Sequence, residues 1–234
     1  MIKSLAILAT AVLSVFSANA QRCSMGYAER IKGATSRQQA LSVAEQAESY
    51  LYTPGSEGYD ESTFIAVLHA LLQSPWLTND DKMRPAAQLA LASKNLPGQK
   101  AADFSFVTPD GNSHRLSDVN TPFTIIFFND PECDDCAAIK QQIGENNMLQ
   151  QLVTQKKLTI ICLYPFDDEA LWRSTSYPAN VVNGWDSTMQ IESTESYVLL
   201  QMPSLYLLGA DMQVLKKNAT LSCIISYLQH YSAE

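Results

Sequence analysis

The chain has 234 residues, of which 46% are hydrophobic and 17% charged, an ordinary composition for a globular protein of one large or two small domains. Its formal net charge at pH 7 is −8, and the acid excess is concentrated in residues 98–234, which hold sixteen acidic and eight basic side chains. Binding to nucleic acid needs an excess of Lys and Arg to contact the phosphates, so the charge excludes nucleic acid as an expected partner.

Residues 1–20 have the pattern of a secretory signal peptide. Lys3 precedes an apolar run over residues 5–16, and Ala18-Asn19-Ala20 matches a small-residue cleavage site. The run is too short to span a bilayer, so we expect a periplasmic or otherwise exported protein with no membrane span once the signal is removed. Such a compartment permits disulfides.

Residues 21–97 are predicted to form a small all-α domain. Ser36 and Gln39 have the spacing of a capping box, which predicts a helix to about Leu51. A segment with Pro and Gly separates it from a second predicted helix, and a further cap begins a third. In chain order, we expect these helices at 37–51, 61–73 and 79–94. The segment contains no catalytic motif, so we expect a docking, oligomerisation or stability module.

Residues 98–234 alternate between strand and helix patterns, which predicts an α/β domain with a mixed sheet. Apolar, β-branched and aromatic runs indicate the strands, and Pro and Gly clusters indicate the turns. In chain order, we expect strands at 104–107, 114–116 and 123–128, a helix at 137–149, a strand at 157–164, a helix at 167–174, a loop at 177–186, a helix at 192–200, strands at 204–208 and 213–216, and a closing helix at 219–231.

Cys133 and Cys136 stand where the predicted strand at 123–128 changes into a helix. A Cys-x-x-Cys pair at such a junction is typical of a thiol–disulfide redox centre. The unpaired N–H groups and the dipole of a helix N-terminus favour an anion. We therefore expect Cys133 to ionise more readily than a free thiol, and Cys136, one turn later, to close a disulfide with it.

Two other uses of this cysteine pair stay open. A zinc site needs four ligands, or three and a water, and the remaining cysteines and histidines have no ligand spacing, so we expect no metal. A purely structural disulfide also fits an exported protein.

Cys162 and Cys223 lie in apolar stretches, where buried, inert thiols are expected. Because the cysteines number five, at least one, such as Cys23, is free or pairs between molecules.

The segment from Gly98 to the end resembles the thioredoxin fold, in the secreted subgroup similar to TlpA and ResA. The resemblance depends on residues 98–104 (Gly-Gln-Lys-Ala-Ala-Asp-Phe), the Asp110-Gly111 turn, the cysteine pair and residues 202–208 (Met-Pro-Ser-Leu-Tyr-Leu-Leu). The mature chain further resembles Bacteroidetes-type exported proteins that join a helical domain of unknown role to such a module. The resemblance implies a mixed central sheet flanked by helices, preceded by the small all-α domain.

The resemblance also implies that the Met202–Pro203 bond is cis and that this loop lies against the cysteine pair. A proline brings no N–H beside the thiolate, and the backbone of Met202 can pair with an extended substrate peptide. The other interpretation is an ordinary trans proline that opens an edge strand.

Two departures from the thioredoxin pattern bear on the redox chemistry. Phe127 replaces the buried Asp that thioredoxins place six residues before the first cysteine, so Cys136 must pass its proton to water or to another acid.

The second departure is a group of acids around Cys133, formed by Asp130, Glu132, Asp134 and Asp135. Negative charge nearby disfavours a thiolate, although salt screens exposed charges. Asp and Glu are also common at any helix N-terminus.

These patterns predict an exported thiol–disulfide oxidoreductase whose redox group is the Cys133–Cys136 disulfide, without a soluble cofactor. Cys133 attacks a protein disulfide and Cys136 resolves the mixed disulfide. Because a poorly stabilised thiolate favours the disulfide form, we expect a reductase supplied with electrons from a membrane-side donor. The alternatives are a peroxide-reducing enzyme of the same fold, whose Pro-x-x-x-Thr-x-x-Cys pattern is missing here, and a non-enzymatic interaction module with a structural disulfide.

Overall fold

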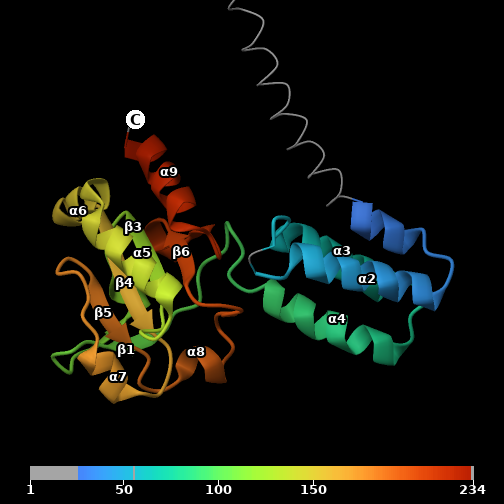
Figure 1. The fold of residues 1–234 in the computed structure, drawn as a ribbon, viewed down its shortest axis with the longest axis horizontal. Helices are drawn as coiled ribbons and strands as arrows, with labels where there is room; N and C mark the ends of the chain where they lie inside the picture. The colour runs from blue at the N-terminus through green and yellow to red at the C-terminus, as the bar shows by residue number, and fades with distance from the viewer. Residues whose placement is uncertain (1–25, 55, 233–234) are drawn as a thin grey trace, which may run out of the picture. The chain divides into compact units, whose positions relative to one another are not determined.

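The computed structural model describes residues 26–54 and 56–232 (Figure 1). The predicted signal peptide and Cys23 lie outside these residues. The chain divides into two compact units, with the boundary between Ser93 and Lys94, whereas the sequence pattern placed it between residues 97 and 98.

The first unit is helical, and each of its three complete helices begins at a side-chain cap. Helical residues 26–32 are followed by α2 (Arg37–Leu51), α3 (Glu61–Gln73) and α4 (Asn79–Ala92). Each cap side chain accepts the backbone N–H three residues further along the chain, and these caps are Ser36, Asp60 and Thr78. Because these caps are local signals, the predicted bounds of the helices agree with the structure to within two residues.

An apolar core joins the helices of the first unit. Its fully buried side chains include Leu51, Phe64 and Leu68, and the rings of Tyr52 and Phe64 stack with their centroids 4.5 Å apart. On the surface, Arg37 of α2 donates two hydrogen bonds to Asp81 of α4, and this guanidinium holds the pKa of Asp81 well below its usual range. The unit is therefore a small, independently packed helical module.

The second unit is built on a mixed sheet, as the sequence predicted. Within the described residues, the sheet has seven strands in the order β2-β1-β5-β4-β3-β6-β7. The bounds are β1 (Ser105–Val107), β2 (Ser113–Arg115), β3 (Phe123–Phe128), β4 (Leu158–Tyr164), β5 (Val182–Trp185), β6 (Ser204–Leu208) and β7 (Val214–Lys216). Strand β4 runs parallel to β3 and to β5, and the other pairs are antiparallel.

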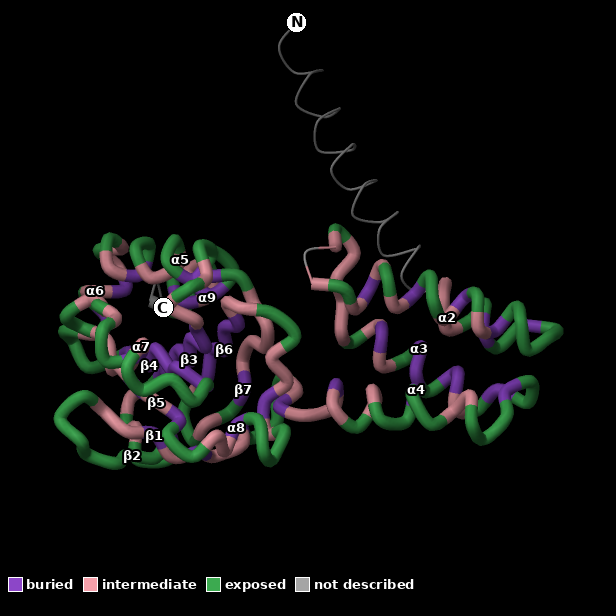
Figure 2. The backbone as a smooth tube through the Cα atoms, turned by 60° about the horizontal axis from the view of Figure 1, so that its bottom comes forward, coloured by how far each residue is buried: buried purple, intermediate pink, exposed green. Residues whose placement is uncertain are grey.

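Two apolar layers enclose this sheet, which Figure 2 shows as buried strands at the centre of the second unit. All six residues of β3 are buried. Because alternate side chains point to opposite faces, Ile125 and Phe127 join one cluster while Ile126 and Phe128 join the other. The helices of this unit are α5 (Asp134–Glu145), α6 (Asn147–Thr154), α7 (Glu169–Ser174), α8 (Gln190–Ser193) and α9 (Leu221–Ser232). The fold is thus the predicted α/β thioredoxin-like class.

Three predicted elements were wrong in part. The predicted helix at 137–149 is two helices, because Asn146 accepts the backbone N–H of Leu149 and begins α6. The predicted helix at 192–200 is the single turn α8. The predicted loop at 177–186 contains β5, whose residues pair in parallel with β4.

β5 contains Asn183 and Gly184, residue types that are uncommon in strands, and the packing around Gly184 explains why a glycine is needed there. A Cβ on Gly184 would lie 2.9 Å from a ring carbon of Phe106 and 3.2 Å from a methyl carbon of Leu163. We expect Gly184→Ala to lower the free energy of unfolding by about 1–3 kcal/mol, the usual cost of overpacking a buried site. The change in the free energy of unfolding is measured by urea unfolding, monitored through the fluorescence of the stacked Trp172 and Trp185.

The control is Gly33→Ala in the first unit, whose new Cβ would approach the backbone oxygens of Glu29 and Arg30, at 3.4 and 3.9 Å, both ordinary contacts. Its free energy of unfolding should change by less than about 0.5 kcal/mol. A Gly184→Ala protein as stable as the wild type would contradict the packing of β5 beneath Phe106.

Candidate functional site

Cys133 is the N-cap residue of α5. Its backbone is extended, and its Sγ accepts the backbone N–H of Cys136 at 3.3 Å, in the place of the oxygen of a usual Ser or Asp cap. Both cysteines are free thiols in this structure. The sulfur of Cys133 thus lies at the N-terminus of the helix, as predicted, and accepts a hydrogen bond from a backbone N–H of the first turn.

The two sulfurs differ in their access to solvent. Cys133 is half-buried, whereas Cys136 is only 2% exposed. Burial is the main reason why the pKa of Cys136 is raised to about 12, and the neighbouring Cys133 and the charge of Asp130 raise it further. Cys133 is therefore the sulfur that an approaching molecule meets first, and Cys136 is a sheltered thiol that holds its proton.

The loop before β6 lies against Cys133. The Met202–Pro203 peptide bond is cis, and the Cys133 thiol donates to the carbonyl oxygen of Met202 at 3.6 Å. Phe128 at the end of β3 is paired with Ser204 at the start of β6. The segment that follows β3, which carries the cysteines, therefore lies beside the segment that precedes β6, which carries Met202 and Pro203. The predicted cis bond is confirmed, and the interpretation of Pro203 as an ordinary trans proline is wrong.

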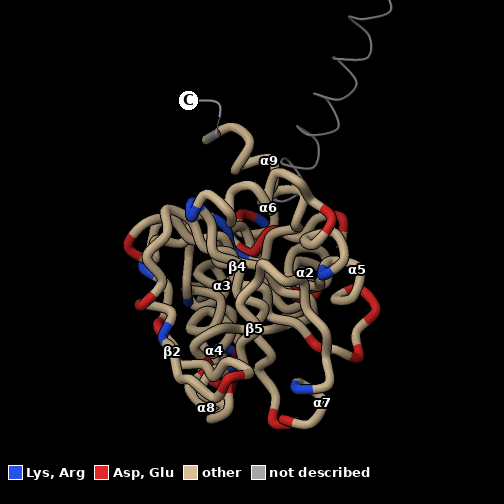
Figure 3. Tube along the Cα trace, turned by 90° about the vertical axis from the view of Figure 1, so that its left-hand side faces the viewer, with Lys and Arg blue, Asp and Glu red and all other residues tan. Residues whose placement is uncertain are grey.

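The predicted acids occupy two kinds of position. Glu132, Asp134 and Asp135 are exposed, and Figure 3 shows acidic positions beside α5 and α7. Asp130 is half-buried and its Oδ1 accepts the backbone N–H of Glu132 at 3.0 Å. Among these acids, Asp130 is the one whose charge contributes to the raised pKa of Cys136. The tuning role of Glu132, Asp134 and Asp135 stays a prediction.

A polar pair that the sequence did not indicate, buried Asn129 and partly buried Tyr177, lies close to the dithiol. Asn129 donates through Nδ2 to the carbonyl oxygens of Phe127 and Leu163, at 3.3 and 3.1 Å, and accepts the hydroxyl of Tyr177 at 2.9 Å. Lys140 of α5 places its Nζ 5.0 Å from the ring centroid of Tyr177. Asn129 and Tyr177 are 48 positions apart, so no local pattern could have joined them.

Cys162 and Cys223 were predicted to be buried, and of these two only Cys162 is. Cys162 on β4 is fully buried opposite Phe127, and burial raises the pKa of its thiol to about 12. Cys223 is exposed on α9, contrary to the prediction, because it lies on the outer side of a helix whose inner side carries Leu221 and Ile224.

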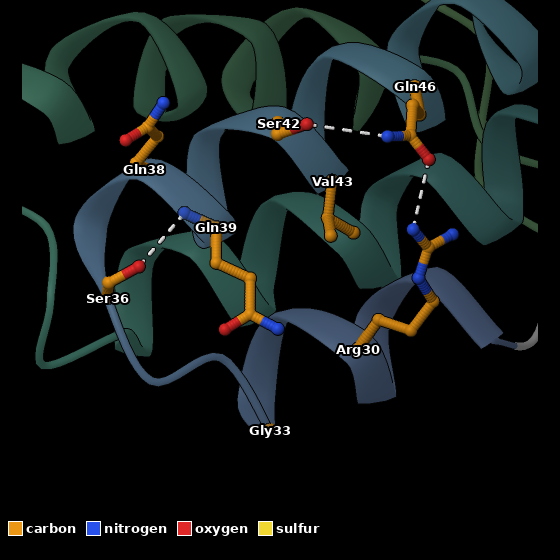
Figure 4. Close-up of a pocket in the computed structure, with 8 residues that line it drawn as sticks. All are labelled: Arg30, Gly33, Ser36, Gln38, Gln39, Ser42, Val43 and Gln46. Carbon is orange, nitrogen blue, oxygen red and sulfur yellow. Dashed lines mark hydrogen bonds between the residues drawn. The ribbon is translucent and has the colours of Figure 1, made fainter.

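Other possible sites in the described residues are limited. No group of three or more His, Cys, Asp or Glu side chains there could hold a metal ion, and no helix there is both long and apolar enough to cross a membrane. An open cavity of about 680 Å³ lies in the first unit between the segment of residues 30–33 and α2 (Figure 4). Arg30 on its wall donates to Gln46 at 2.9 Å, but the lining holds no Cys, His, Asp or Glu.

Comparisons with known proteins match both parts of the chain. A thioredoxin-like protein from Bacteroides caccae is 32% identical, with a TM-score of 0.84 over 90% of this chain and 76% of that chain. A conserved protein of unknown function from Bacteroides fragilis is 28% identical, with a TM-score of 0.55 over 57% of this chain and 98% of its own. The C-terminal domain of an uncharacterized protein from Bacteroides fragilis is 29% identical, with a TM-score of 0.57 over 58% of this chain and 99% of its own.

A family described as a domain of unknown function, DUF5106, matches residues 11–95. None of the curated proteins compared with the chain matches it.

The difference between the two sulfurs predicts an order of alkylation in the reduced protein. A rise of the pKa from 9 to about 12 lowers the thiolate fraction at neutral pH by about a thousandfold. With iodoacetamide at pH 7, we expect Cys133 to be modified before Cys136, and Cys136 at least a hundredfold more slowly than the exposed Cys223. Peptide mass spectrometry over time measures each rate.

The urea-unfolded protein is the control, in which all cysteines should react at similar rates. Equal rates for Cys133 and Cys136 in the folded protein would contradict the difference in burial.

Proposed function

The chain belongs to the thioredoxin-like proteins, and from this we propose that it is an exported thiol–disulfide oxidoreductase that acts on protein disulfides through Cys133 and Cys136. The observation that carries the proposal is the arrangement of one accessible and one sheltered sulfur at the start of α5, with the accessible sulfur 3.6 Å from the Met202 carbonyl. A structural disulfide needs neither this difference in access nor a facing loop.

The reaction we propose has two exchange steps. The Cys133 thiolate, which accepts the N–H of Cys136, attacks one sulfur of a substrate disulfide; the substrate S–S bond breaks and the other substrate sulfur leaves as a thiolate. Cys136 then loses its proton and attacks Cys133 Sγ. The mixed disulfide breaks, the second substrate thiolate leaves, and the Cys133–Cys136 disulfide forms. Two electrons pass from the dithiol to the substrate, and the residues need no soluble cofactor.

The substrate we propose is an extended protein segment that carries a disulfide. The backbone of Met202 is next to Cys133, and an extended peptide that pairs with it would bring a cysteine towards that sulfur. Such peptides include exported proteins with disulfides or haem-attachment cysteines. Export itself depends on residues 1–20, whose composition is that of a cleavable signal.

The direction we propose is reduction, with electrons supplied by a membrane-side donor. The strong oxidant DsbA has a potential of about −120 mV because its reduced form is stabilised as a thiolate. Here burial raises the pKa of Cys136, so this thiol of the reduced pair is not stabilised as a thiolate. The disulfide form is relatively favoured, which makes the dithiol a reductant.

The reduction potential tests this direction. Equilibration with glutathione or dithiothreitol buffers should give a value below about −200 mV, closer to the roughly −270 mV of thioredoxin than to the value of DsbA. A value near −120 mV would reverse the proposed direction while leaving the oxidoreductase assignment intact.

Trapping with Cys136→Ser tests the reaction itself. Without the resolving thiol, Cys133 should remain bound to a model substrate as a mixed disulfide that dithiothreitol releases, and the turnover of insulin disulfides should fall by at least a hundredfold. Mass spectrometry of the adduct, together with the insulin turbidity assay, measures both effects.

Cys133→Ser should form no adduct, and Cys223→Ser, a change on the exposed face of α9, should keep wild-type turnover. A Cys136→Ser protein that traps nothing would favour the module with a structural disulfide. Rapid peroxide consumption by the wild type would favour the peroxidase alternative.

A further inference from the structure

The resolving step requires a proton acceptor for Cys136. The thiol is 2% exposed, and it attacks only as a thiolate. Phe127 is fully buried in the same apolar cluster and can accept no proton. The acceptor must therefore come from another residue near this sulfur, or from water that reaches it.

Most of the ionisable groups near Cys136 are poor acceptors. Cys162 on β4 is fully buried, and burial raises the pKa of its thiol, so it keeps its own proton. The hydroxyl of Tyr177 donates to Asn129, and its pKa is raised by burial. Lys140, which follows Cys136 by one turn on α5, carries three donors and no acceptor when charged. Cys133 is occupied in the mixed disulfide at this stage.

Among the acids around the dithiol, Asp130 is the half-buried one, whereas Glu132, Asp134 and Asp135 are exposed to solvent. The backbone N–H of Asp130 donates to Cys136 Sγ at 3.5 Å, which fixes this residue beside the sulfur. Its carbonyl oxygen accepts the N–H of Cys133 at 3.1 Å, so one residue contacts both members of the dithiol. The charge of its carboxylate acts on Cys136, and the residue is half-buried at the point where β3 leads into α5.

We propose that Asp130 accepts the proton of Cys136 during the resolving step. The inference depends on the proposed function. The Cys136 S–H bond breaks and its proton passes to the Asp130 carboxylate, directly or through one water. The sulfur electron pair then forms the bond to Cys133 Sγ, and the substrate sulfur leaves as a thiolate. Asp130 later returns the proton to solvent, because it lies at the half-exposed rim of the site.

Asp130 has two effects on the resolving step, and they have opposite signs. As a nearby negative charge, it raises the pKa of Cys136 and so reduces the thiolate fraction. As a proton acceptor, it increases the rate of proton loss. Asp130→Asn removes both effects, and Asn can still accept the N–H of Glu132 through its side-chain oxygen. A faster resolving step would mean that the charge alone matters; a slower one would mean that the acceptor matters.

The reagent 5,5′-dithiobis(2-nitrobenzoate) separates the two steps. Attack by Cys133 releases a first thionitrobenzoate, and resolution by Cys136 releases a second from the mixed disulfide. We would use the chain from residue 21 onward, with Cys23→Ser and Cys223→Ser, so that only the dithiol reacts rapidly. With Asp130→Asn at pH 7, we expect a first phase within about threefold of the parent and a second phase at least tenfold slower, within the usual effect of a general base.

The matched controls are Asp130→Glu and Asp167→Asn. Glutamate keeps the acceptor and should restore the second phase to within about fivefold of the parent. Asp167 is an exposed acid after β4, at the same edge of the sheet as Asp130, and its change should leave both phases unaltered.

The outcomes separate this inference from the proposed function. An unchanged or faster second phase in Asp130→Asn would overturn the role of Asp130. Equal slowing of both phases in Asp130→Asn and Asp130→Glu would mean a structural role and would also overturn it. A parent protein that releases no second thionitrobenzoate would instead contradict the proposed dithiol reaction.

Discussion

The site depends on one hydrogen bond, the backbone N–H of Cys136 to the sulfur of Cys133 at the start of α5. This bond can form only where β3 ends and α5 begins, and β3 is held on both sides, in parallel by β4 and antiparallel by β6. The same register that fixes β3 brings Ser204, and with it the Met202–Pro203 bond, beside the helix tip. The sheet therefore positions the dithiol and the facing loop together.

Burial gives the two sulfurs different chemistry. Cys133 is half-buried and contacts the Met202 carbonyl, whereas Cys136 is surrounded by the apolar residues beneath α5, including Phe127. Burial of a thiol stabilises its protonated form, so Cys136 remains a thiol until a disulfide on Cys133 comes within its reach. Position 127 carries no acid, but the backbone of Asp130 contacts both cysteines, and the charge of its carboxylate acts on Cys136.

Local signals in the sequence predicted the parts of the fold that local physics determines. The caps at Ser36 and Thr78 predicted the beginnings of α2 and α4, and the apolar run 123–128 coincides with β3. The cysteine pair and the loop at Pro203 were found because their motifs are short. The β5 strand was missed because its stability comes from pairing with β4 and from the fit of Gly184 beneath Phe106. Asn129 and Tyr177 were missed because only the tertiary fold joins them.

A consequence follows from the cap of α5. The sulfur that closes the first turn of α5 is the same sulfur that takes up the substrate, and a sulfur in a disulfide accepts hydrogen bonds more weakly than a thiolate does. Formation of the mixed disulfide thus weakens the hydrogen bond that caps α5, and the first turn of α5 frays more easily. Cys136 lies in that turn. Covalent capture of a substrate would then itself give the second cysteine the freedom to move towards the bond that it must break.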